Sequence, residues 1–268
     1  MTEPRHILSL SGGKDSAALA LYMRDRVPNM EYIFNDTGKE LPETYEYLDR
    51  IGDYLGRPVI RLNADKGFDH WYEMYGGMIP SNHRRWCTKM LKLKPFEAYV
   101  GNEHVLNYVG IRADESREGY VSTKPTIEPI YPFIEDGLVY ADIVRILHQS
   151  GVGMPPYTKW GRTRSGCYFC FYQQKIEWVK LLETYPDLYE EAAKYEKEYE
   201  KTGNLFTWSQ GERLEDLKQP ERIEEIKLDA ARRVERLKNV RDNMSLAAVY
   251  QAEMDAQVDE EGCVVCTV

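Results

Sequence analysis

The chain has 268 residues, of which 43% are hydrophobic and 29% are charged, so it can bury the core of one large globular domain or two small ones, and global disorder is excluded. No apolar run approaches the roughly 18 residues that cross a bilayer, and the N-terminal residues lack the layout of a secretory signal. The formal net charge of −9 argues against a generally basic nucleic-acid binder. We therefore expect a soluble cytoplasmic protein with no membrane partner.

The first half of the chain alternates predicted strands and helices. A buried strand is predicted at residues 6–10, a short apolar strand at 31–35 and further strands at 58–62 and 105–111, with helices at 17–23 and 42–55. Strands that alternate with helices at this spacing are typical of a parallel, doubly wound α/β sheet.

The pattern changes after about Pro129. Loops rich in proline, glycine and tyrosine precede helices predicted at 138–149, 174–200 and 220–254. The last helix is long and amphipathic, so it can pack on its own domain or on another subunit of an oligomer. We expect three parts: an α/β domain over 1–135, a helical and loop region over 136–218 that closes its ligand site, and a long helix with an acidic tail over 219–268.

A glycine-rich loop, Ser11-Gly12-Gly13-Lys14-Asp15-Ser16, joins the first predicted strand to the first helix. Glycines allow backbone N–H groups to turn toward an anion, and the helix presents its positive N-terminal end. Lys14 and the two serine hydroxyls add donors. The loop differs from the GxxxxGK[ST] pattern of ordinary nucleoside triphosphatases but has the same physical parts, so we predict a phosphate site.

Two basic segments stand in this acidic chain, at residues 79–95 and 157–180, and both contain cysteine. Cys87 lies in the first, and Cys167 and Cys170 form a Cys-x-x-Cys pair in the second. An odd total of five cysteines without a secretory signal favours metal or redox chemistry over a disulfide framework. Solvated charged faces and a structural cysteine pair are the alternative interpretations.

The loop resembles the signature of the PP-loop adenine-nucleotide α-hydrolases, which include ATP pyrophosphatases, tRNA thiolation enzymes and, with an altered loop, phosphoadenosine phosphosulfate (PAPS) reductases. Further matches to the PAPS-reductase-like branch cover, with the loop, about residues 5–180. They are Phe34–Gly38 followed by Glu40, Pro42 and Thr44; Arg85–Lys89 with Lys92 and Pro95; and Gly110–Arg117. The motifs are most similar to those of the ATP pyrophosphatases of DNA phosphorothioation. The resemblance implies a HUP-type, mainly parallel doubly wound sheet with a helical C-terminal extension.

The resemblance also implies a set of site residues at the carboxyl ends of the strands, where open α/β sheets bind ligands. Asp36 could hold a magnesium ion or simply cap the next helix, and Glu115 could orient an arginine, help to hold magnesium or form a surface salt bridge. Lys14, Asp15 and Arg112 are the expected catalytic residues. The expected nucleotide-binding residues are Ser11, Gly12, Gly13, Lys14, Asp15, Ser16, Asp36, Thr37, Gly38, Gly110, Arg112, Glu115 and Arg117.

The form of the loop favours one reaction within this family. PAPS reductases generally lack its Lys-Asp pair, because their substrate has no β,γ-pyrophosphate to hold, whereas this chain retains the pair. We therefore expect ATP cleavage between the α and β phosphates, with Lys14 on the departing pyrophosphate and Mg²⁺ and Arg112 on the α-phosphate. The activated acceptor, DNA or tRNA guided by the two basic segments, would receive sulfur from a donor such as a cysteine desulfurase.

Family members hold a [4Fe-4S] cluster through cysteines at positions that match Cys87, Cys167 and Cys170. Thr88 stands where a second adjacent cysteine can occur, so the fourth ligand is unassigned; Cys263 or Cys266 could supply it or could be bystander thiols. A Zn²⁺ site that adds His83 to the three cysteines is an alternative.

Two other functions stay open. A PAPS or adenylyl-sulfate reductase would need a C-terminal redox cysteine, for which Cys263 and Cys266 are candidates. A non-catalytic nucleotide-binding assembly subunit would bind its partner through the helix at 220–254.

Overall fold

The computed structural model describes residues 3–116, 124–196, 198–199, 204–209 and 211–243. Within them the chain forms two compact units, residues 3–75 with 83–168 and residues 76–82 with 169–243. None of the helices described combines the length and apolar character that a membrane crossing requires.

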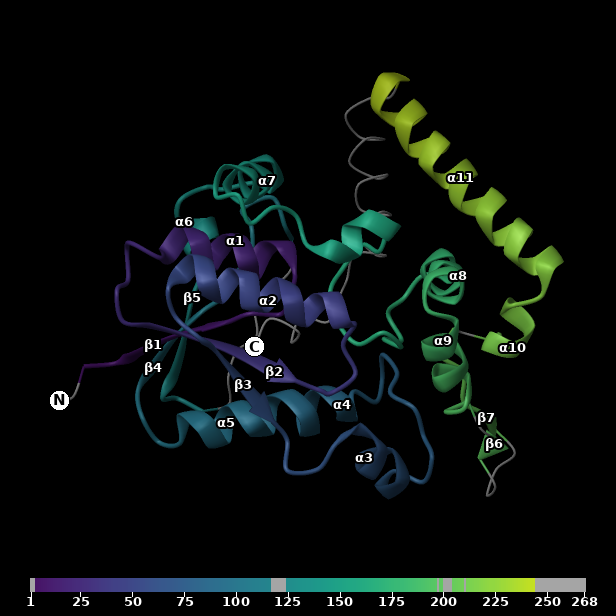
Figure 1. The fold of residues 1–268 in the computed structure, drawn as a ribbon, viewed down its shortest axis with the longest axis horizontal. Coiled ribbons are helices and arrows are strands. Elements are labelled where there is room, and N and C mark those ends of the chain that lie inside the picture. The colour runs from purple at the N-terminus through teal and green to yellow at the C-terminus, as the bar shows by residue number, and fades with distance from the viewer. Residues whose placement is uncertain (1–2, 117–123, 197, 200–203, 210, 244–268) are drawn as a thin grey trace. The chain divides into compact units, whose positions relative to one another are not determined.

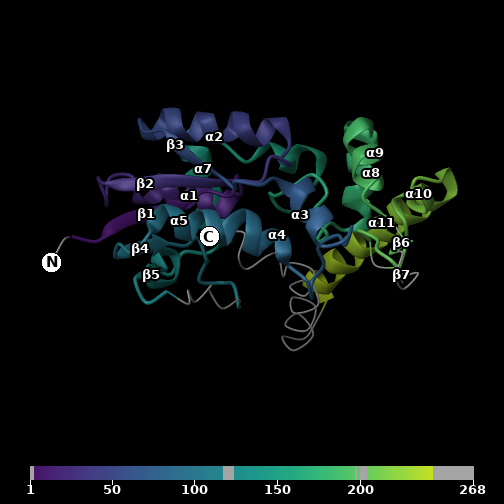
Figure 2. The same ribbon diagram turned by 90° about the horizontal axis from the view of Figure 1, so that it is seen from below.

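The first unit contains a sheet of five strands that all run parallel, in the order β3-β2-β1-β4-β5, and their labels follow this order from top to bottom in Figure 2. At the centre, Leu8 pairs with Tyr32 on one side and Tyr108 on the other. The order changes direction beside β1, and ligands bind in open α/β sheets at such a switch point. The doubly wound parallel fold is thereby confirmed. The strands are β1 (Arg5–Ser9), β2 (Met30–Asp36), β3 (Val59–Asn63), β4 (Val105–Tyr108) and β5 (Ile127–Ile130).

Helices cover both faces of this sheet (Figure 1). On one face lie α1 (Lys14–Met23), α2 (Pro42–Leu55), the short α6 (Pro132–Glu135) and α7 (Tyr140–Gln149), and on the other lies α5 (Lys94–Val100). Successive side chains of a strand point to opposite faces, so Leu8 enters the core beneath α1 while Ile7 enters the core beneath α5. Both side chains are fully buried, as expected for a sheet covered on both sides.

Strand β5 is missing from the sequence prediction because Pro129 lies within it. Proline cannot donate to a strand ladder, but β5 is the edge strand of the sheet, where a missing N–H is tolerated.

The connection from β3 to β4 is helical, which the sequence did not predict. It contains α3 (Phe68–Met74), α4 (Trp86–Thr88), a π-helical segment η1 (Lys89–Leu93) and α5. Trp86 is 4% exposed and its ring lies 4.9 Å from Phe68 and 5.4 Å from Tyr75 between centroids. Trp86 is therefore a packing residue, and its ring is not available as a stacking platform for a ligand.

The second unit is mainly helical, with α8 (Lys175–Thr184), α9 (Pro186–Ala193), α10 (Leu214–Leu217), α11 (Pro220–Asn243) and an antiparallel pair, β6 (Glu198–Tyr199) and β7 (Asn204–Leu205). The helical stretch predicted at 174–200 occurs as two helices, because Pro186 can begin a helix but cannot continue one, and its end at 198–199 is the strand β6. Glu212 joins α8 to α11 by accepting from Lys175 at 2.6 Å and from Arg222 at 2.6 Å. Residues 244–254 of the predicted last helix lie outside the described residues.

Candidate nucleotide site

The glycine-rich loop lies between the end of β1 and the first turn of α1. Glycine is favoured at positions 12 and 13 of this loop for different physical reasons. Gly12 has φ of 72°, and a Cβ there would lie 2.7 Å from Cγ2 of Thr44. A Cβ at Gly13 would lie 3.0 Å from the hydroxyl oxygens of Ser11 and Ser165. Only glycine therefore fits position 12 without strain, and the backbone can approach a ligand closely here.

The two serines of the loop brace its backbone. The Ser11 N–H donates to Oγ of Ser16 at 3.1 Å, and that hydroxyl donates to the Gly13 carbonyl at 3.2 Å. The Gly13 N–H donates to Oγ of Ser11 at 3.3 Å. These bonds hold the loop in its turned shape before any ligand arrives.

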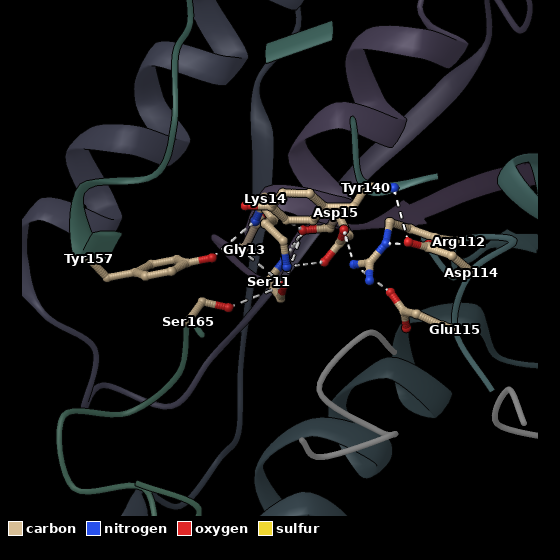
Figure 3. A network of polar contacts seen from close by, with 11 residues as sticks. Ser11, Gly13, Lys14, Asp15, Arg112, Asp114, Glu115, Tyr140, Tyr157 and Ser165 are labelled. Atoms are coloured by element: carbon tan, nitrogen blue, oxygen red, sulfur yellow. Dashed lines mark hydrogen bonds and ion pairs between the residues drawn. The ribbon is translucent and has the colours of Figure 1, made fainter. Parts of the chain in front are cut away.

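A segment far along the chain packs over the loop (Figure 3). The hydroxyl of Tyr157, on the 3₁₀ helix η2 (Pro156–Trp160), accepts a hydrogen bond from the Lys14 N–H at 3.3 Å, and the Ser165 hydroxyl donates to Oγ of Ser11 at 3.4 Å. Burial raises the pKa of Tyr157, so its oxygen is a neutral hydroxyl. This oxygen stands where the first N–H of α1 would meet an oxygen of a bound phosphate.

Arg112 lies beside the loop and is held by three carboxylates. Its Nη1 lies 3.0 Å from Oδ1 of Asp15 and 2.7 Å from Oε1 of Glu115, and its Nε donates to Asp114 at 2.8 Å. Burial alone would lower the pKa of Arg112, but the neighbouring carboxylates raise it above its ordinary value. Arg112 is only 8% exposed, so its guanidinium is fixed in direction and permanently charged.

Asp15 connects the two cations of the site. Its Oδ2 lies 3.1 Å from Nζ of Lys14, and its Oδ1 lies 3.0 Å from Nη1 of Arg112. Gly110 lets the Arg112 segment approach, because a Cβ there would lie 3.0 Å from the Asp15 carbonyl oxygen. Figure 3 shows Lys14, Asp15 and Arg112 in one continuous network. The structure thus brings the three expected catalytic residues together.

The end of β2 forms a second turn. Asp36 accepts from the Gly38 N–H and from the Tyr45 hydroxyl through one oxygen, Oδ1, at 2.8 Å each. These two bonds fix the direction of the carboxylate within a turn. Asp36 does not cap the next helix, because α2 begins at Pro42 with Leu41 as its cap residue. Gly38 has φ of 69°, which favours glycine.

Thr37 and Glu40 contact Cys167 at the same end of the sheet. The Cys167 Sγ lies 3.2 Å from Oγ1 of Thr37 and 3.7 Å from Oε1 of Glu40. Burial raises the pKa of Glu40, whereas the charges of Lys92 and Arg162 lower it. Oε2 of Glu40 is buried and has no hydrogen-bond partner among the described residues.

The expected metal ligands are divided between the two compact units. Cys87 and Cys167 belong to the first unit and Cys170 to the second, and no group of three or more His, Cys, Asp or Glu side chains there is arranged to hold a metal ion. This holds for the iron–sulfur set and for the zinc alternative with His83, which is exposed. Cys263, Cys266 and Arg117 lie outside the described residues.

The basic side chains of the two segments differ in exposure and in hydrogen bonding. Arg84, Lys89 and Lys94 are exposed in residues 79–95. In residues 157–180, however, Arg162 is 3% exposed and donates to the Cys167 carbonyl at 2.6 Å. The second segment is therefore partly a structural element of the site rather than a solvated basic face.

Comparison with known proteins identifies the family. Residues 5–171 match the phosphoadenosine phosphosulfate reductase domain. The chain belongs to this family. The resemblance of its motifs to the PAPS-reductase-like branch is thereby confirmed.

Individual relatives of this PAPS-reductase family member are distant. It is 27% identical over 213 residues to an uncharacterized protein of Methanocaldococcus jannaschii, covering 74% of this chain and 43% of that protein. It is 26% identical over 111 residues to an adenosine 5'-phosphosulfate reductase of Staphylococcus haemolyticus, covering 41% of this chain and 45% of that enzyme. The matched regions span less than half the length of both relatives.

The fold is also similar to a crystal structure of PAPS reductase from Candida auris in its phosphate complex. The TM-score is 0.50 at 16% identity, over 62% of this chain and 82% of that one. This likeness supports the common fold.

Tyr157, Ser165, Asp114 and Glu40 were not among the predicted site residues. Asp114 and Glu40 belong to the sequence motifs that resemble the PAPS-reductase-like branch, so their position in the sequence could have identified them as site residues. Tyr157 and Ser165 reach the loop from more than 140 positions away in sequence, and no local pattern marks such contacts.

Proposed function

We propose that this chain is an ATP pyrophosphatase, which cleaves ATP between the α and β phosphates and thereby activates an acceptor for sulfur insertion. The observation that carries the proposal is the Lys14-Asp15 pair at the first turn of α1, with Arg112 on the same carboxylate. A loop that served only an adenylyl sulfate would need no lysine for the two outer phosphates.

The chemistry follows from these positions. An acceptor oxygen attacks the α-phosphorus, the bond from that phosphorus to the bridging oxygen breaks, and pyrophosphate leaves with the electron pair. The N-terminal N–H groups of α1 and the Lys14 ammonium stabilise the departing pyrophosphate, while Arg112 offsets the charge on the α-phosphate. Asp15 and Glu115 are the carboxylates that would contact Mg²⁺ arriving with ATP, which needs few protein ligands because phosphate oxygens supply the others.

The charge balance of the site supports a metal-bound nucleotide as the substrate. Lys14 and Arg112 face Asp15, Asp114 and Glu115, so two cations stand against three carboxylates and the formal charge is −1. A free triphosphate would be repelled by such a site, whereas its magnesium complex carries less negative charge.

We extend the proposal to nucleic acid as the acceptor, in DNA phosphorothioation or tRNA thiolation. The exposed Arg84, Lys89 and Lys94 are suited to a phosphate backbone. In the second step a sulfur nucleophile delivered by a donor such as a cysteine desulfurase attacks the adenylated centre, a bond to sulfur forms, and AMP leaves with the oxygen.

A [4Fe-4S] cluster on Cys87, Cys167 and Cys170 stays a prediction, and neither of the two proposed reaction steps uses it. Anaerobic purification with iron and acid-labile sulfide analysis tests it. A brown protein that absorbs near roughly 400 nm and loses this band in Cys167→Ala would support the cluster. A colourless protein that contains zinc would contradict it.

A PAPS or adenylyl-sulfate reductase is the second candidate function, because the Staphylococcus relative is named as an adenosine 5'-phosphosulfate reductase. One assay separates the two functions. The purified chain is incubated with Mg²⁺ and ATP, and separately with PAPS or adenylyl sulfate and reduced thioredoxin, each with DNA and with tRNA as acceptors.

We expect AMP and pyrophosphate from ATP in the wild type and in the control Lys66→Ala, whose lysine is exposed outside the site, and neither product in Lys14→Ala. Sulfite from PAPS or adenylyl sulfate, with no cleavage of ATP, would overturn the proposal in favour of the reductase. Binding of ATP without AMP over hours would favour a non-catalytic subunit.

A further inference from the structure

Tyr140 is the first residue of α7 and lies at the edge of the proposed phosphate site. Its ring centroid is 5.6 Å from Nζ of Lys14 and 5.5 Å from the guanidinium carbon of Arg112. Figure 3 shows the ring beside the network that joins these two cations. Despite these contacts Tyr140 is 47% exposed, a large fraction for an aromatic residue that serves only packing.

The backbone holds Tyr140 in this position. The Tyr140 N–H donates to Oδ2 of Asp114 at 3.2 Å, and Oδ1 of the same carboxylate accepts from Nε of Arg112 at 2.8 Å. One residue earlier in the loop, the Ala113 N–H donates to the Leu138 carbonyl at 2.9 Å. The beginning of α7 is therefore fastened to the segment that carries Arg112, so the ring and the guanidinium keep a fixed relation.

An aromatic ring can hold the side chains of Lys14 and Arg112 without adding a negative charge to the site, which a carboxylate cannot do. Asp15 also holds Lys14 and Arg112, but its negative charge competes with an incoming phosphate for both of them. A π face attracts a cation without adding a charge that the anion must displace. When phosphate oxygens replace Asp15 on the two cations, the ring still limits the directions that their side chains can take.

We propose that Tyr140 is a positioning residue that holds Lys14 and Arg112 toward the two outer phosphates of the nucleotide. This inference rests on the proposed function, since it concerns the same phosphate site. In this proposal the aromatic ring of Tyr140, and not its hydroxyl group, positions the two cations.

The experiment is calorimetric titration of the purified full chain with magnesium pyrophosphate, followed by steady-state AMP formation from ATP. The variants are Tyr140→Phe, Tyr140→Trp and Tyr140→Leu. The matched control is Tyr54→Leu. Tyr54 is also an exposed tyrosine, at 36%, with the guanidinium carbon of Arg24 4.9 Å from its ring centroid, and it lies near the C-terminal end of α2.

We expect Tyr140→Phe and Tyr140→Trp to bind pyrophosphate within about twofold of the wild type, with Trp the tightest, because the π face is kept. Tyr140→Leu should weaken binding and lower kcat/KM by about 3- to 10-fold, which converts to about 0.7–1.4 kcal/mol, with an unchanged melting temperature. Tyr54→Leu should leave both values unchanged.

The outcomes distinguish the two levels of inference. If the wild type binds pyrophosphate and Tyr140→Leu binds it equally well, the role of Tyr140 is refuted while the phosphate site stands. If Tyr140→Phe loses binding as Tyr140→Leu does, the hydroxyl and not the ring is responsible, and the inference is again refuted. If the wild type binds neither pyrophosphate nor ATP, the proposed function itself fails.

Discussion

Replacing Gly12 with alanine tests the shape of the loop, and the structure allows the expected loss in free energy of unfolding to be estimated. The new side chain meets two separate penalties. A positive φ of 72° costs a non-glycine residue about 1–2 kcal/mol, and a Cβ at 2.7 Å from Cγ2 of Thr44 is an overpacked contact worth about 1–3 kcal/mol. Together these terms reach about 2–5 kcal/mol, a large share of the stability of an ordinary domain.

A double-mutant cycle separates the two penalties. Thr44→Ser deletes the methyl group that the new Cβ would meet, at a cost of about 0.8 kcal/mol for the lost buried carbon. In the pair Gly12→Ala with Thr44→Ser, the contact penalty should disappear and the φ penalty should remain. Gly67→Ala is the control, because Gly67 has φ of −72° and no atom within 4 Å of its Cβ position.

The assay is urea unfolding followed by circular dichroism, with pyrophosphate affinity measured on the same samples. We expect Gly12→Ala to lose both stability and pyrophosphate binding, the double variant to recover about 1–3 kcal/mol, and Gly67→Ala to change by no more than about 1 kcal/mol. A Gly12→Ala protein as stable as the wild type, or a double variant without recovery, would refute the described loop geometry.

Three further predictions concern other parts of the chain. Arg112→Lys keeps the charge but loses the planar fork, so kcat/KM for AMP formation should fall about 10²-fold with little change in melting temperature; an unchanged rate would remove the arginine from the mechanism. The bond from Arg222, opposed by burial, lowers the pKa of Glu212 to about 2 from its ordinary 4.5, so this stabilisation is complete above pH 4.5 and is lost as pH falls toward 2. Melting curves of Glu212→Gln should therefore depend less on pH across this interval, and an equal pH dependence would contradict the assignment. Tyr157→Phe removes the oxygen that occupies the Lys14 N–H, so pyrophosphate should bind about 2- to 10-fold more tightly; weaker binding would mean that the hydroxyl contacts the ligand itself.

The sequence was sufficient where the signal is local. The helix predicted at 42–55 has the bounds of α2, because Tyr45, Leu48, Ile51 and Leu55 repeat at helical spacing and Gly56 ends it in the left-handed conformation. The four strands predicted in the first half of the chain all occur. β1, β2 and β4 are largely buried, as strands of a sheet covered on both faces should be. The loop after β1 could also be placed, because its glycine-rich sequence directly follows the first predicted strand and precedes the first helix.

Features that depend on distant contacts were not predictable in this way. The Lys14 N–H finds its acceptor in Tyr157, 143 positions along the chain, and the bridging role of Asp15 depends on Arg112, 97 positions away. Strand β5 exists because β4 offers a free neighbouring edge, which outweighs the local preference of Pro129 for a loop. Spacing within one segment carries no information about such pairings.

The central claim is that the loop after β1 grips the two outer phosphates of ATP, and a crystal structure with magnesium and α,β-methylene-ATP, in which the scissile bridge cannot be cleaved, tests it most directly. We predict the β and γ phosphates on the N-terminal N–H groups of α1 and on the Lys14 ammonium, with the α-phosphate facing Arg112. Outer phosphates directed away from this loop, with Tyr157 still on the Lys14 N–H, would contradict the account.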